Sequence, residues 1–121
     1  MILPVVAYGD PVLKAEAEDI EQGQKGLEAL IANMWETMYA SEGVGLAAPQ
    51  VGESIRLFIV DASPFAEGEK GDLACKDFKR VMINPVIFEE SEAEDGMEEG
   101  CLSIPGIREN VQRPVAIGVE Y

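Results

Sequence analysis

A single helix-period stripe of apolar residues near the N-terminus constrains the fold of this chain more than any other feature. In "QKGLEALIANMWETMYAS" the apolar residues recur every three or four positions, which predicts an amphipathic helix with one buried face. Gly43 follows and is expected to end the helix. We interpret the stripe as core packing and not as a cofactor site. Its members are Leu27, Leu30, Ile31, Met34, Met38 and Tyr39.

The remainder of the chain is dominated by predicted strands. The run "IRLFIVDA" at 55–62 is almost continuously apolar and rich in β-branched residues, which is typical of a buried strand. "VMINPVIFEES" at 81–91 predicts a second strand, in which Pro85 indicates an edge or a bulge. "VAIGVEY" at 115–121 alternates and predicts a third. One long helix followed by antiparallel strands indicates an α+β fold.

The connecting segments carry weaker signals. Asp10 and Pro11 fit the N-cap and the first position of a short helical turn. Residues 63–80 mix Pro, Gly and charges, so we expect a long loop or a distorted hairpin. "EAEDG" at 92–96 predicts a turn. "MEEGCLSIPG" at 97–106 predicts a short extended segment that ends at its Pro-Gly pair.

The length of 121 residues fits one domain, which we assign to residues 1–121. No turn, polar tail or final helix follows the strand that reaches Tyr121. We therefore expect this domain to be incomplete and the chain to be part of a longer protein. A natural chain that ends in an edge strand is the alternative.

Charge and cysteine content narrow the partners and the location. The chain has 23 acidic and 9 basic residues and a net charge of −14, so it should repel phosphate backbones and bind no nucleic acid directly. "MILPVVAYGD" lacks a basic region and is too short to span a bilayer, so we expect neither a signal peptide nor a membrane partner. Cys75 and Cys101 are too few for a disulfide framework, which favours the cytoplasm, although a bridge between them stays open.

The chain contains no histidine. It therefore cannot by itself form a Ser-His-Asp triad, a Cys-His pair or an imidazole metal site. Under this restriction Cys101 alone indicates little, because it could be a small core residue, a nucleophile without a base, or one metal ligand without others.

"GVGLAAPQ" at 43–50 has an unusually low content of large side chains. Gly43 and Gly45 would allow another chain to approach closely, and an extended peptide could pair there as an added strand. Gln50 offers an amide donor for a developing oxyanion. Taken alone, the segment is better interpreted as a glycine-rich turn from helix to strand with a surface glutamine.

Two motifs together carry a resemblance. "GVGLAAPQ" at 43–50 and "EGCLS" at 99–103 resemble, in order, the first two signature motifs of the bacterial-type peptide deformylases. "NMWETMYASEG" at 33–43 is similar to the first long helix of that family. The resemblance extends from "GDPVL" to the final "VEY". It implies a helix packed on antiparallel strands, with the C-terminal helix that carries a third motif, His-Glu-x-x-His, missing from these residues.

The resemblance implies a metal-dependent hydrolase that removes the N-formyl group from the initiator methionine of nascent polypeptides. The metal in the complete enzyme would be Fe²⁺, or Zn²⁺, Ni²⁺ or Co²⁺, held by one cysteine and two histidines. Cys101 corresponds to that cysteine. Because the histidines are missing, we expect this chain alone to bind no metal and to be inactive.

The resemblance also implies roles for other residues. Gln50 and the backbone N–H of Leu102 would hold the oxygen of the tetrahedral intermediate. An N-formylmethionyl peptide would be the substrate, and contact with the ribosome would be transient at most. The residues implied in substrate binding are Gly43, Val44, Gly45 and Arg108.

Two other functions remain open. A degenerate homologue could bind extended peptides without hydrolysing them, and a cysteine hydrolase could use Cys101, although it would lack a base. A longer coding sequence with His-Glu-x-x-His would favour the enzyme. We also expect the 121-residue chain to self-associate or to retain a bound C-terminal segment, because apolar faces that a late helix would cover are left open.

Overall fold

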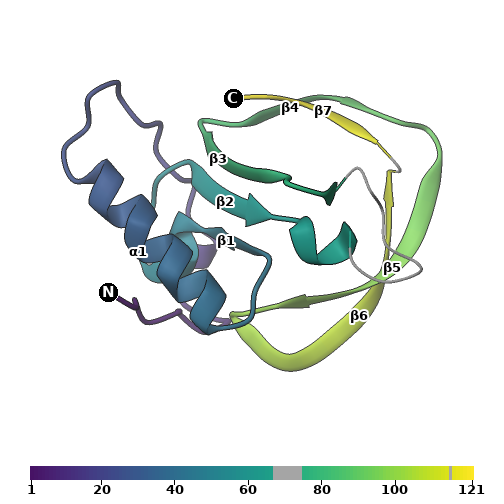
Figure 1. Ribbon diagram of the computed structural model, residues 1–121, viewed down its shortest axis with the longest axis horizontal. Helices are drawn as coiled ribbons and strands as arrows, with labels where there is room; N and C mark the ends of the chain where they lie inside the picture. Colours follow the sequence, from purple (N-terminus) through teal and green to yellow (C-terminus); the bar gives the residue numbers. More distant parts are fainter. Residues whose placement is uncertain (67–74, 115) are drawn as a thin grey trace.

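The structure is a computed structural model that describes residues 1–66, 75–114 and 116–121. The helix α1 (Leu27–Ala40) lies beside strands that pair in three antiparallel groups among these residues (Figure 1). The α+β prediction is thereby confirmed. The first group, in the order β1-β2-β3, is built from Gly45–Ala47, Leu57–Asp61 and Lys79–Ile83. The other two pair β4 with β7 and β5 with β6, which span Val86–Glu90, Ile117–Glu120, Glu94–Cys101 and Ile104–Pro114.

The hydrophobic core lies between α1 and the β1-β2-β3 sheet. Met34 and Met38 on the helix are fully buried and pack with the alternate residues Leu57 and Ile59 of β2. The expected stripe on α1 is confirmed apart from Tyr39, which is 47% exposed. The buried apolar residues among those described are Ile20, Met34, Met38, Leu46, Ala48, Leu57, Ile59 and Met82.

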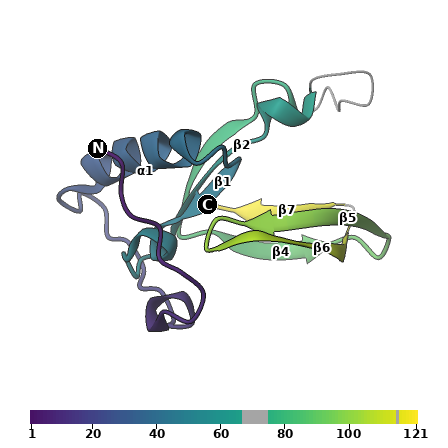
Figure 2. The same ribbon diagram turned by 90° about the horizontal axis from the view of Figure 1, so that it is seen from below.

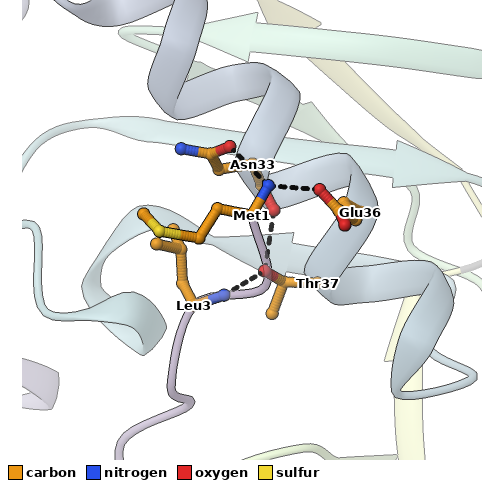
Figure 3. A network of polar contacts seen from close by, with 5 residues as sticks. All are labelled: Met1, Leu3, Asn33, Glu36 and Thr37. Carbon is orange, nitrogen blue, oxygen red and sulfur yellow. Dashed lines mark hydrogen bonds and ion pairs between the residues drawn. The ribbon is translucent and has the colours of Figure 1, made fainter.

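Thr37 occupies a buried position on α1 that the apolar pattern did not predict. Its hydroxyl oxygen accepts a hydrogen bond from the Leu3 amide at 2.8 Å and donates to the Asn33 carbonyl at 2.7 Å (Figure 3). The Met1 amine donates to Asn33 Oδ1 at 3.1 Å and pairs with the Glu36 carboxylate. These interactions hold the N-terminal segment against α1.

We predict that Thr37→Val destabilises the protein by about 1–2 kcal/mol, because it leaves the partly buried Leu3 amide without its acceptor. Urea denaturation would measure the change in the free energy of unfolding. Deletion of residues 1–3 provides a double-mutant cycle. Equal effects of the Thr37 substitution with and without the deletion would contradict the proposed tether.

The end of α1 differs from the prediction. The residue in the left-handed conformation is Glu42, with φ 58°, and not Gly43. The Glu42 amide donates to the Tyr39 carbonyl and the Gly43 amide to the Met38 carbonyl, which is the Schellman arrangement. Gly43 is small for another reason: a Cβ there would lie 2.9 Å from Leu102 Cδ1.

The predicted strand at 81–91 is two strands in different groups. Asn84 interrupts it with φ 52°, and its side chain accepts from the Ile20 amide and donates to the Ile20 carbonyl, at 2.8 and 2.9 Å. The next carbonyl, of Pro85, accepts from Arg56 at 2.6 Å. Pro85 therefore lies at a junction between two sheets. β4, which follows it, pairs with β7 in a two-stranded sheet and has a register irregularity between Ile87 and Glu89.

The extended segment predicted at 97–106 is confirmed at 97–101 and 104–106, but its predicted end and the turn predicted at 92–96 are wrong in part. Residues 94–96 belong to β5, and β5 and β6 form a long hairpin that turns through two residues, Leu102 and Ser103. The Pro-Gly pair lies inside β6, where Gly106 has φ 80°. Cross-strand pairing along the hairpin thus overrides a local signal for termination.

The earlier connections agree better with the sequence. Asp10 Oδ1 accepts from the Val12 amide at 3.0 Å and caps η1 (Pro11–Leu13), as predicted. Within 63–80, the turn η3 (Ser63–Ala66) comes first and β3 begins at Lys79; the part of this loop at 67–74 lies outside the described residues.

Candidate active site

A groove of about 810 Å³ separates the end of α1 from the β5–β6 hairpin. Figure 2 shows strands β4 to β7 gathered on one side of the molecule and α1 on the other. Residues 41–45 and Gln50 line one wall, and residues 99–102 and 104–108 line the other. The groove therefore lies between the two motifs that the sequence singled out.

Gln50 connects these motifs directly. It lies in η2 (Ala48–Val51), and its Oε1 accepts from the Ala47 amide at 3.0 Å. Its Nε2 consequently points across the groove and donates to Cys101 Sγ at 3.4 Å and to Ser103 Oγ at 3.3 Å. The amide donor is thus oriented toward the exposed thiol.

The N-terminal segment supports both sides of this arrangement, which the sequence did not suggest. The Val6 amide donates to the Gln50 carbonyl at 2.8 Å, and the Tyr8 amide donates to the Ser103 carbonyl at 2.9 Å. Two residues of one segment therefore fix the position of η2 relative to the tip of the hairpin. Backbone bonds of this kind leave no side-chain signature in a sequence.

Strand β1 presents to the groove an edge with which no other described strand pairs. Sheet order puts β1 at the end of β1-β2-β3, and the Val44 carbonyl accepts from the Asp61 amide at 2.8 Å. Because backbone groups alternate in direction along an antiparallel strand, the N–H and C=O of Gly45 face away from β2. An extended peptide could pair with that edge.

Gly43 and Leu102 meet where the two walls converge. Leu102 is half-buried against the core, and its Cδ1 occupies the space that a side chain at residue 43 would need. The Leu102 amide directly follows Cys101 at the hairpin tip. Arg108 lines the hairpin wall, where it pairs across the strands with Gly100.

Asp61 organises the end of β2 beside the groove. Its Oδ2 accepts from the Tyr39 hydroxyl at 2.7 Å, and its Oδ1 accepts from the Ser63 amide and hydroxyl at 3.0 and 2.6 Å. The hydrogen bonds from Ser63, followed by that from Tyr39, lower the pKa of Asp61. Burial, followed by the bond to Asp61, raises the pKa of Tyr39 to about 12.

We predict a pH-dependent contribution of Asp61 to stability. Because its folded-state pKa is lowered, the contribution is fully present above the ordinary carboxyl pKa and is lost as the pH falls through the folded value. The difference in unfolding free energy between wild type and Asp61→Asn should therefore shrink on acidification from about pH 5, by on the order of 1 kcal/mol or less. A pH-independent difference in urea titrations would contradict the assignment.

A sequence model of the polypeptide deformylase family matches residues 2–121. The chain belongs to the polypeptide deformylase family. It is 54% identical over 125 aligned residues to a peptide deformylase of Christiangramia forsetii. The alignment covers all of this chain and 64% of that relative. For a relative from Flavobacterium psychrophilum the identity is 52% with the same coverage. The chain thus spans 64% of the length of these curated relatives.

Solved deformylase structures share the fold. The crystal structure of peptide deformylase from Thermotoga maritima has a TM-score of 0.85 at 36% identity, and the match covers all of this chain and 74% of that one. A Met-Ala-Ser-bound class I type b peptide deformylase from Acinetobacter baumannii also has a TM-score of 0.85, at 34% identity, with 100% and 76% coverage. The fold predicted from the resemblance is therefore confirmed.

The family implies a catalytic metal ion. Among the described residues that line the groove, Cys101 is the one with a thiol, a ligand type that transition metals favour. Among the described residues, no group of three Cys, Asp or Glu side chains could hold an ion. Glu99 is engaged by Arg113 at 2.9 and 3.0 Å, and this pairing lowers its pKa. The donors in the described part of the chain thus do not by themselves fit a metal ion.

Both cysteines are unpaired, so the bridge left open by the sequence does not form. No helix in the described parts of the chain is long and apolar enough to cross a membrane.

Proposed function

We propose that this chain contributes to the hydrolytic removal of the N-formyl group from the N-terminal methionine of nascent polypeptides. The observation that carries the proposal is the Gln50 amide directed at Cys101 Sγ across a groove with an open strand edge. The bound Met-Ala-Ser in the Acinetobacter structure supports a peptide ligand for such a groove. We place this activity in the cytoplasm, where nascent chains are made.

Cys101 would supply one ligand to the metal, and the others would come from outside these 121 residues, which contain no histidine. The metal, Fe²⁺ or a substitute such as Zn²⁺, Ni²⁺ or Co²⁺, would supply an activated water and polarise the formyl carbonyl. The Gln50 amide and the Leu102 N–H would donate to the oxygen on which negative charge develops.

The substrate peptide would lie along β1. Gly45 offers an outward N–H and C=O for strand pairing. Gly43 lines the same wall and would contribute backbone contacts to the peptide. Val44 would contribute to the same wall, and Arg108 would stand at the mouth of the groove. In this arrangement the formyl group would face Cys101.

The second candidate is a homologue that binds extended peptides without hydrolysis. The same β1 edge favours it, because strand pairing needs no metal. We also propose that the 121-residue chain self-associates, whichever of the two functions it has. β4, β7 and the residue after β7 expose large apolar side chains, namely Val86, Ile87, Phe88, Ile117 and Tyr121.

We predict that the 121-residue polypeptide does not hydrolyse formyl-Met-Ala-Ser, even with Fe²⁺ or Ni²⁺ supplied, because it lacks the further ligands and a histidine base. The test compares it with the intact natural protein that contains these residues. Turnover by the intact protein supports the enzyme, and peptide binding without turnover supports the second candidate. Hydrolysis by the 121 residues within about tenfold of a typical enzyme rate would overturn the prediction.

A further inference from the structure

We propose that Phe65 forms a subsite for an apolar side chain on the third residue of the peptide substrate. The inference rests on the proposed function, which it extends from the formylmethionine to the residues that follow. Phe65 lies outside both signature motifs, at 43–50 and 99–103.

Phe65 is an aromatic side chain that the fold leaves 47% exposed within the groove. The other described residues that line the groove belong to 41–50 and 99–108, so among the described residues Phe65 is the one that follows β2. A large ring that faces a peptide groove offers apolar area that a ligand can bury.

The order of residues along the groove indicates which part of the substrate reaches Phe65. Gln50 is bonded to the Ala47 amide, so the end of the groove at which the reaction would occur lies near Ala47. From Ala47 the chain leads back through β1 to Val44, toward the other end of the groove. Val44 is bonded to Asp61, and η3 begins two residues after Asp61. An extended chain advances about 3.3 Å per residue, so a peptide whose formyl end lies at Cys101 reaches the level of Val44 with about its third residue.

Hydrogen bonds anchor the backbone of η3 (Ser63–Ala66), which carries Phe65. Asp61 Oδ1 accepts from the Ser63 amide and hydroxyl, which anchors the start of η3. The Phe65 amide donates to the Ala62 carbonyl at 3.0 Å, and the Ala62 amide donates to the Phe78 carbonyl at 2.9 Å. A preorganised apolar contact loses little entropy on binding and can therefore discriminate between side chains.

The test measures kcat/KM and peptide affinity in the intact, metal-loaded natural protein. Formyl-Met-Ala-Leu should be preferred over formyl-Met-Ala-Ser by about tenfold. Phe65→Ala should bring this ratio close to one, and Phe65→Leu should retain most of it. The ratio of formyl-Met-Leu-Ala to formyl-Met-Ser-Ala should be unchanged in Phe65→Ala, since it varies the second residue.

Phe88→Ala is the matched control, because Phe88 is 65% exposed and lies on β4, outside the groove lining. Thermal melts establish that each variant is folded. If the wild type hydrolyses all four peptides but Phe65→Ala leaves the third-residue ratio unchanged, the subsite is overturned and the proposed function stands. If no formyl peptide is bound or hydrolysed by the wild type, the proposed function fails, and the subsite fails with it.

Discussion

Cys101→Ser in the intact protein is expected to abolish metal binding and, with it, hydrolysis. A thiol ionises near neutral pH when a metal binds, whereas a serine hydroxyl does not, and thiolate is much the stronger ligand for Fe²⁺ and Zn²⁺. The metal content of dialysed protein should fall to about one tenth or less of the wild-type value. Elemental analysis provides this readout independently of activity.

Cys75→Ser is the matched control for this experiment. Cys75 is also a free cysteine, but it does not line the groove. It should leave both metal content and turnover at wild-type levels. A Cys101→Ser protein that keeps a full equivalent of metal would show that Cys101 is not a ligand.

Gln50→Ala should reduce kcat by roughly 10²–10³, the usual effect of losing one oxyanion donor. KM should change little, because the donor acts on charge that develops in the transition state. Steady-state kinetics with formyl-Met-Ala-Ser would measure both constants. This is the largest effect that we expect from a residue that is not a metal ligand.

The alanine variant also loses the bond from the Ala47 amide to Gln50 Oε1, so a second variant is needed. Gln50→Glu keeps an acceptor for that amide and keeps the size of the side chain, but it removes the donor that faces Cys101. A similar loss in kcat for both variants would assign the effect to the donor. A Gln50→Glu enzyme with near-normal kcat would show that Gln50 only supports the turn.

The elements that the sequence predicted well are those with a strong local period. The stripe on α1 and the apolar run of β2 need only the burial of one face, so local pattern and final packing agree. The motif pair was also sufficient to indicate that Gln50 and Cys101 would meet, although they are 51 residues apart.

The features that sequence reasoning missed depend on contacts between distant segments. Asn84 breaks a continuous apolar pattern because its side chain binds Ile20, 64 residues away. Thr37 is buried because the N-terminal segment supplies its partner. Gly43 is constrained by Leu102 on another wall and not by its own backbone angle. None of these partners can be inferred from local periodicity or propensity.

The distribution of buried residues has a consequence for motion. The buried apolar residues of the described chain all lie between Ile20 and Met82, whereas the hairpin β5–β6 exposes most of its described side chains. Elements with few buried contacts open at a lower free energy than the core does. Backbone amides of β2 should therefore exchange with deuterium only through global unfolding, and those of β6 through local opening. One wall of the groove would then stay fixed while the wall that bears the thiol fluctuates, so that the width available to an incoming peptide varies without any change in the core.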